Sequence, residues 1–185
     1  MHGRDLGQLL SQIAPMRTAD GSVVRSDWGG WALGGIGVIA GRAECGMHHV
    51  VSLPVEFLFS MTATTNTSGV IAKGPNGTRV VVDASSGTFE GPKLKGTVKA
   101  PGGDWVTVRP DGVLQLDVRV LLETDDGAII LMQYKGIGVD GGSNIRTAPL
   151  FETGDERYAW LNSVQAVAHG STGDGDVTYQ VYALR

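Results

Sequence analysis

The sequence predicts an all-β fold: a single antiparallel meander that closes into a barrel of about eight or nine strands. Three observations support this prediction. Apolar and polar residues alternate from Val55 onward, turn-forming sequences rich in Gly, Pro, Asn and Asp separate the alternating runs, and the chain of 185 residues contains 28 glycines. Such a meander usually closes, because closure removes the exposed edges of the outermost strands.

The first fifty residues differ from the rest of the chain. A short amphipathic run at 6–13 is followed by a polar and then a glycine-rich stretch. We expect two parts: a poorly structured N-terminal extension at 1–50, partly helical or flexible, and a β-barrel domain at 51–185. Two roles remain open for the extension, a flexible arm or a segment that packs on a partner subunit or covers a pocket, with Trp28 and Trp31 as anchors.

The first half of the barrel domain is predicted from alternation and turn sequences. Val55, Phe57, Phe59 and Met61 alternate with polar or smaller neighbours, which is the period of a strand. We expect strands, in chain order, at 55–62, 78–84, 87–90, 96–99 and 105–108, with turns at 75–77 and 101–103.

The second half contains the longest strand, at 113–124. It is followed by Asp125-Asp126-Gly127, for which we predict a two-residue hairpin turn at Asp126-Gly127 that pairs 118–124 with 128–134. A final pair of strands is expected at 159–169 and 177–184. No helix is expected after residue 50.

Composition and charge argue against several classes of partner. The net charge is −4, and Lys and Arg are scattered singly, so nucleic acid is not expected to bind. The apolar run at 31–40 contains three glycines and has about half the length of a membrane span, so no membrane partner is expected either. The single cysteine, Cys45, cannot form an internal disulfide, which favours a cytoplasmic location.

Metal and nucleotide motifs are not found. None of the four histidines has further ligands at the spacing of a zinc site, and no glycine-rich phosphate loop opens a helix. We therefore expect neither a metal nor a cofactor.

The two faces of the longest strand differ in polarity. One face is apolar throughout, and the other is polar; the apolar residues are Leu114, Leu116, Val118, Val120 and Leu122, and the polar ones are Gln115, Asp117, Arg119 and Glu123. Alternation does not decide which face is inside. Either the apolar face fills the barrel and Asp117 and Arg119 form an exposed pair, or the polar face lines a pocket.

Three blocks of sequence resemble one bacterial family. Residues 86–105 begin Ser-Gly-Thr-Phe-Glu-Gly-Pro-Lys, 109–127 begin Arg-Pro-Asp-Gly-Val-Leu-Gln-Leu, and 146–162 begin Arg-Thr-Ala-Pro-Leu-Phe-Glu-Thr. In order and spacing these blocks resemble domain-of-unknown-function family 3237, from about Pro54 to the C-terminus. The resemblance implies a barrel with a shape somewhat like that of the lipocalins. Its members are mostly uncharacterised, so it implies no reaction.

Polar residues in these blocks form a candidate ligand site. On an extended strand, Tyr158, Trp160 and Asn162 share one face, where they could stack on a flat ligand and hydrogen-bond its edge. Arg119 and Arg146 could bind a carboxylate. The alternative is that the aromatic residues belong to the apolar core and that the two arginines are ordinary surface residues.

A carboxylate in the same pocket could transfer a proton. Glu152 and Asp104 are the candidates for catalysis, because burial would raise the pKa of either side chain. We expect one pocket inside the barrel that contains Arg119, Arg146, Glu152, Trp160 and Asn162.

These residues predict a barrel that binds a small organic molecule. The leading hypothesis is a cofactor-independent lyase, hydratase or isomerase that acts on an aromatic or carbonyl-bearing carboxylate. One alternative is a non-catalytic ligand-binding barrel, which would need the same stacking residues and no reactive carboxylate. Another is an oligomeric assembly protein without a ligand, so a homo-oligomer is left open.

Overall fold

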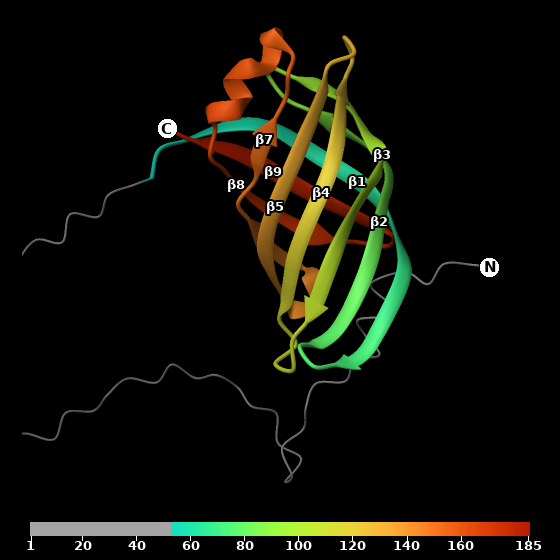
Figure 1. The fold of residues 1–185 in the computed structure, drawn as a ribbon. Helices are drawn as coiled ribbons and strands as arrows, with labels where there is room; N and C mark the ends of the chain where they lie inside the picture. Colours follow the sequence, from blue (N-terminus) through green and yellow to red (C-terminus); the bar gives the residue numbers. More distant parts are fainter. Residues whose placement is uncertain (1–52) are drawn as a thin grey trace, which may run out of the picture.

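A computed structural model describes residues 53–185, and they form one closed antiparallel barrel with an additional strand (Figure 1). The expected extension at 1–50 and its short helix lie outside the described residues. The strands are β1 Val55–Gly74, β2 Gly77–Glu90, β3 Lys95–Val108, β4 Leu114–Thr124, β5 Ile129–Val139, β6 Asn144–Thr147, β7 Leu150–Glu152, β8 Ala166–Thr172 and β9 Asp176–Leu184. Two 3₁₀ helices, η1 Asp140–Gly142 and η2 Glu156–Ser163, interrupt them.

The strand order explains how the barrel closes. Neighbouring strands follow the order β4-β3-β2-β1-β9-β8-β6-β5-β7, and an additional pairing of β4 with β5 joins the two ends. All printed pairings are antiparallel. β6 and β7 pair with different parts of β5, so β7 is the strand left outside the closed ring. The expected antiparallel barrel is confirmed.

Several predicted short strands are parts of longer ones. The expected strands at 78–84 and 87–90 form the single strand β2, and those at 96–99 and 105–108 form β3. The turn predicted at 101–103 is wrong, because β3 continues through it. Its pairing with β4 shifts register between Lys99 and Gly103, so the Pro-Gly-Gly sequence forms a bulge within the strand.

The β4–β5 hairpin has the predicted pairing but a different turn. Val118 pairs with Tyr134, as expected. The amide of Gly127 donates to the carbonyl of Thr124 at 2.8 Å, and only Gly127 among the loop residues has a positive φ, of 86°. These features describe a three-residue loop, with a turn at Asp125-Asp126 and a left-handed glycine after it. The predicted two-residue turn is therefore wrong, because Asp126 does not adopt the positive φ that such a turn needs.

Residues 156–163 form the helix η2 instead of the beginning of a strand. Asp155 caps this helix by accepting a hydrogen bond from the amide of Arg157 at 3.0 Å. The prediction of no helix after residue 50 is wrong here. The next strand, β8, starts only at Ala166, so Tyr158, Trp160 and Asn162 do not share a strand face.

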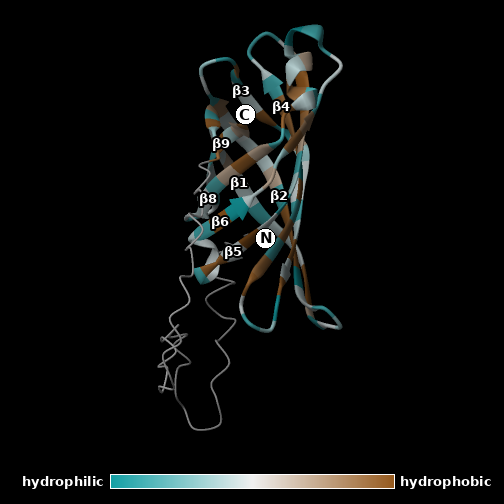
Figure 2. Cartoon of the chain, turned by 90° about the vertical axis from the view of Figure 1, so that its left-hand side faces the viewer, coloured by the Kyte–Doolittle hydropathy of each residue, from teal (hydrophilic) through white to brown (hydrophobic). Residues whose placement is uncertain are grey.

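The barrel interior is filled by the apolar faces of the strands. The five alternating apolar residues of β4, from Leu114 to Leu122, are all buried, and they belong to the same core cluster as Phe59 and Val181. Figure 2 shows hydrophobic segments along the strands and hydrophilic turns at their ends. Burial therefore settles the question left open by alternation: the apolar face of β4 points inward. In the part of the chain described here, no helix combines the length and hydropathy needed to cross a bilayer.

Candidate functional site in the barrel interior

One end of the barrel is solid and the other holds a cavity. At the solid end, Phe59 packs against Phe89 and Phe151 with ring centroids 5.5 and 6.1 Å apart, and Leu161 of η2 is fully buried above them. Toward the other end lies a cavity of about 50 Å³, enough for a few water molecules. Its wall is mostly apolar and includes Met61, Val82, Ala84, Val106, Leu116, Val118, Val120 and Ile145.

Among residues 53–185, Asp104 is the one carboxylate that lines this cavity. It lies in a row of partners that runs from Val82 through Asp104 and Val118 to Tyr134 across four strands. The other three side chains of the row are buried, and Asp104 lines the cavity beside them. A carboxylate oxygen of Asp104, Oδ1, accepts a hydrogen bond from the backbone amide of Asp117 at 2.9 Å, which fixes the carboxyl group against β4.

Burial raises the pKa of Asp104 from its ordinary value of 3.8 to about 7. The amide of Asp117 opposes this shift by stabilising the charged form, and the negative charge of the Asp117 side chain adds to it. A carboxyl group with this pKa exists in both protonation states near neutral pH. It can therefore both accept and donate a proton, as a general acid–base catalyst must.

Two tyrosines accompany Asp104 in the cavity wall. Tyr134 of β5 and Tyr179 of β9 meet edge to face, with ring centroids 5.6 Å apart. Burial raises the pKa of both phenols above the ordinary value, and the charge of Asp104 raises both further. Both tyrosines are therefore neutral hydrogen-bond donors at any physiological pH.

Part of the cavity wall lies next to the β8–β9 turn. Thr172 and Val177 flank this turn and line the cavity, together with Thr65 of β1. The amide of Thr65 donates to the carbonyl of Gly175 at 2.8 Å, which ties β1 to the turn at this point. Beyond Thr64, β1 no longer pairs with β9 in the sheet.

The expected convergence of five side chains inside the barrel is not what the structure shows. Arg119, Arg146 and Glu152 are exposed, since they alternate with inward residues such as Val118 and Ile145. Arg119 forms an ion pair with Asp117 at 3.5 Å on the outer face of β4. The structure thus brings only Asp104, of the predicted site residues, into the interior cavity.

The three predicted residues of η2 hold that helix to the barrel instead of lining the cavity. The hydroxyl of Tyr158 donates to the carboxylate of Asp126 at 3.1 Å. The side-chain amide of Asn162 donates to the carbonyl of Thr153 and accepts from its amide, both at 2.9 Å. The ammonium group of Lys93 lies 5.5 Å from the ring of Trp160.

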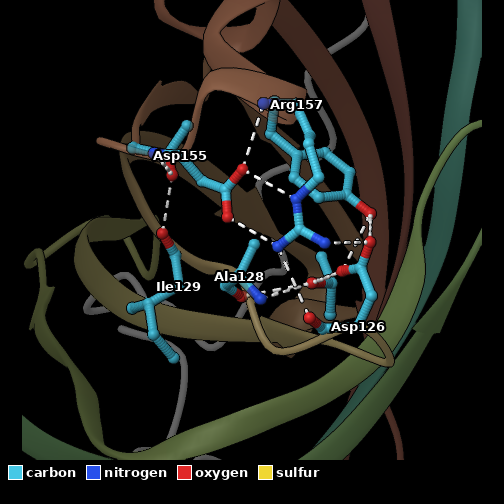
Figure 3. A network of polar contacts seen from close by, with 8 residues as sticks. Asp126, Ala128, Ile129, Asp155 and Arg157 are labelled. Carbon is cyan, nitrogen blue, oxygen red and sulfur yellow. Dashed lines mark hydrogen bonds and ion pairs between the residues drawn. The ribbon is translucent and has the colours of Figure 1, made fainter.

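Arg157 is the centre of this attachment (Figure 3). Its guanidinium binds Asp126 in the β4–β5 loop at 2.9 Å and Asp155 at 2.6 Å, so it joins η2 to the hairpin. Hydrogen bonds from Arg157 lower the pKa of Asp155 to about 2. The network is exposed to solvent, and its role is to keep η2 over the solid end of the barrel.

Sequence reasoning missed the two cavity tyrosines, although a signal for one of them was present. Tyr134 was predicted to pair with Val118, so the inward face of Val118 also implied an inward Tyr134. Tyr179 shares a strand face with Val177 and Val181, but its position beside Tyr134 depends on the curvature of the closed barrel. Within residues 53–185, no cluster of three or more His, Cys, Asp or Glu side chains could hold a metal.

Comparisons with known proteins match this barrel. The family described as protein of unknown function DUF3237 matches residues 53–184. An uncharacterised UPF0311 protein of Bradyrhizobium diazoefficiens is 29% identical over 126 residues, which cover 60% of this chain and 82% of the relative. A protein of Penicillium herquei named a hydroalkoxylation enzyme is 32% identical over 113 residues, which cover 60% of this chain and 70% of the relative.

Solved structures agree with the fold. A crystal structure from Acinetobacter baumannii, described as a beta-barrel like protein, superposes with a TM-score of 0.64 at 30% identity and covers 74% of this chain and 99% of its own. A crystal structure of an enzyme from Penicillium herquei gives a TM-score of 0.59 at 27% identity and covers 73% and 96%.

Proposed function

We propose, from the premise that this chain belongs to the DUF3237 family, that it is a proton-transferring enzyme of the lyase, hydratase or isomerase type. The observation that carries the proposal is Asp104, a carboxyl group with a pKa of about 7 in a mostly apolar cavity. The relative named a hydroalkoxylation enzyme supports one reaction class in particular. That class is the addition of an O–H group across a carbon–carbon double bond, or the reverse elimination.

The chemistry of the cavity favours a neutral substrate. None of the described residues that line it is basic, so a carboxylate bound there would have no charged partner. Its polar side chains, among the described residues, are those of Asp104, the two tyrosines and the threonines Thr65 and Thr172. These groups suit a substrate with an apolar body and a carbonyl or phenol oxygen, of which only the reacting end fits the cavity of about 50 Å³. We therefore replace the carboxylate expected from the sequence with a neutral carbonyl-bearing or phenolic compound.

Asp104 performs the proton transfer in this proposal. In the direction of addition, its carboxylate takes the proton from the attacking hydroxyl while the new C–O bond forms at one alkene carbon. The protonated carboxyl group then gives the proton to the other carbon. Tyr134 and Tyr179 donate hydrogen bonds to a conjugated carbonyl oxygen, which carries the negative charge between these two events. One O–H bond and one π bond break, one C–O and one C–H bond form, and no electrons are exchanged with another reactant.

Hydrogen exchange in heavy water tests the proposal. Purified full-length protein is incubated in D₂O with a panel of neutral enones, hydroxyaryl alkenes and aryl ketones, and deuterium in recovered substrate and product is measured by NMR and mass spectrometry. We expect at least one compound to gain deuterium at carbon. Asp104→Asn should abolish this gain and still bind, because an amide keeps the shape and can still accept from the amide of Asp117.

Two matched variants complete the experiment. Glu152→Gln removes an exposed carboxylate from β7 and should leave the rate unchanged. Tyr134→Phe should lower kcat by roughly 100–1,000-fold, the usual effect of removing one hydrogen-bond donor to an oxyanion. If Asp104→Asn exchanges deuterium as fast as the wild type, Asp104 is not the proton-transfer group. Binding without any exchange would favour the non-catalytic ligand-binding barrel.

A further inference from the structure

A second concave surface lies on the outside of the barrel wall. It is a groove of about 720 Å³ that crosses strands β2 to β6, and its size falls in the range of about 300–1,000 Å³ that is common for small-molecule sites. Its apolar side chains include Trp105 and Ile137, which are 43% and 40% exposed. Its basic side chains are Arg79, Lys135 and Arg146.

These cations differ from most others in the barrel. Among residues 53–185, seven Lys and Arg side chains form ion pairs: Lys93, Lys95, Lys99, Arg109, Arg119, Arg157 and Arg185. Four others, Lys73, Arg79, Lys135 and Arg146, form none within this part of the chain, and three of these four line the groove. Among the described residues, the one acidic side chain of the groove is that of Asp117, which pairs with Arg119 at 3.5 Å and lies opposite Lys135 in the β4–β5 register. The groove therefore carries a positive charge that the described residues do not neutralise.

Strand register determines the spacing of these groups. Ile137 of β5 pairs with Arg146 of β6, and Lys135 lies two residues before Ile137 on the same face, so Lys135 and Arg146 are close neighbours. Trp105 lies on β3, two strands away from Lys135. Two strand spacings amount to about 10 Å, which is close to the length of a two-ring aromatic acid.

We propose that the groove binds a small organic carboxylate with a flat apolar body. The carboxylate is held by Lys135 and Arg146, and the body lies over Ile137 against the indole of Trp105. Arg79, at the far end of the groove, takes a second polar group of the ligand. This site lies outside the barrel, on the opposite side of the wall from Asp104, and it does not depend on the proposed reaction.

Isothermal titration calorimetry and ¹⁵N NMR on the full chain test this site, with 2-naphthoate as the probe and 2-naphthamide as its uncharged match. We expect 2-naphthoate to bind and to shift the indole N–H signal of Trp105, and 2-naphthamide to bind at least tenfold more weakly. Lys135→Gln and Arg146→Gln should each weaken 2-naphthoate by at least tenfold. Lys99→Gln removes one positive charge from the outer wall elsewhere and should leave the affinity unchanged.

Three results would overturn the proposal. The first is no binding of 2-naphthoate at millimolar concentration, or equal binding of the acid and the amide. The second is equal affinity of the Arg146→Gln and Lys99→Gln variants, which would mean that net charge alone matters. The third is a concentration-dependent dimer in analytical ultracentrifugation that Arg146→Glu dissociates, because the groove would then be an interface between two copies of the chain.

Discussion

A single inward carboxyl group distinguishes the interior of this barrel from an ordinary apolar core. Asp104 occupies a position where its neighbours along the row are Val82 and Val118, and only one backbone amide compensates its charge. Burial raises its pKa to about 7, so the ionised form is the unfavourable one in the folded state. A carboxyl group whose ionised form is destabilised by burial, and whose pKa therefore lies near neutral pH, is typical of a functional site.

This cost predicts a pH dependence of stability. Because the folded pKa of Asp104, about 7, lies above its ordinary value of 3.8, the folded state holds the proton over this interval and the unfolded state releases it. Its contribution to the free energy of unfolding should therefore fall as the pH rises through the interval, by roughly 2 kcal/mol between about pH 5 and about pH 8. Urea denaturation at these two pH values measures it.

Asp104→Asn is the variant that isolates this contribution. The amide does not ionise, so the stability difference between variant and wild type should shift toward the variant as the pH rises. Glu152→Gln, which removes an exposed carboxylate from β7, serves as the control. A difference between Asp104→Asn and wild type that does not change with pH would contradict the raised pKa.

At the scale of elements, the β4–β5 hairpin and η2 form one unit at the solid end of the barrel. The hairpin loop presents Asp126, and Arg157 and Tyr158 of η2 bind it. Thr124 also bonds to the loop, since its hydroxyl accepts from the amide of Ala128 at 2.8 Å. The turn geometry therefore determines where η2 is attached.

The turn depends on Gly127. Its φ is 86°, and no atom lies within 4 Å of the position that a Cβ would occupy, so a substitution there acts through backbone strain alone. Gly127→Val should lower the free energy of unfolding by roughly 1–2 kcal/mol, the cost of a left-handed conformation for an L residue. Gly127→Asn should cost clearly less, because Asn tolerates this region. Equal thermal midpoints for the two variants and wild type would show that the turn lies elsewhere.

We predict that weakening the attachment of η2 lowers the local stability of this helix and leaves the overall stability of the barrel nearly unchanged. Arg157→Gln breaks both ion pairs of an exposed network, and exposed pairs add little to overall stability, so Tm should change little. Amide hydrogen exchange in residues 155–163 should become faster, because η2 then opens independently of the barrel. Arg109→Gln, which breaks a pair at another loop, is the matched control. Unchanged exchange in η2 would mean that the buried Leu161 alone holds the helix.

At the scale of the whole molecule, the barrel is complete within the described residues. β1 and β9, the first and the last strand of the chain, pair with each other, and the pairing of β4 with β5 closes the ring. The buried core cluster runs from Leu58 to Ala183. A cytoplasmic location and a homo-oligomer remain predictions from the sequence.

We therefore predict that residues 1–52 are dispensable for folding. A chain of residues 53–185 should be soluble and should melt cooperatively, because every strand of the closed barrel keeps its partners. Circular dichroism and calorimetry on this chain and on the full chain measure the effect. A truncated protein without a cooperative transition would contradict the prediction and make the N-terminal residues part of the folding unit.

By itself the sequence determined the fold class, the family and the separation of an apolar from a polar face along the longest strand. Local patterns determine these properties: a period of two along β4, the Asp-Gly loop at Gly127, and the three sequence blocks within 86–162 that resemble the family. Asp104 was identified as a candidate for proton transfer from its residue type alone. Its pKa, however, depends on burial, which sequence does not measure.

The tertiary structure alone decided which polar residues meet. Arg119, Arg146 and Glu152 were expected inside with Asp104, but alternation places them on the outer face once the apolar face of each strand is buried. Tyr179 reaches Tyr134 because the sheet curves until β9 and β5 line one cavity. Closure of a barrel brings together residues that are distant along the chain, and no local sequence pattern contains that curvature.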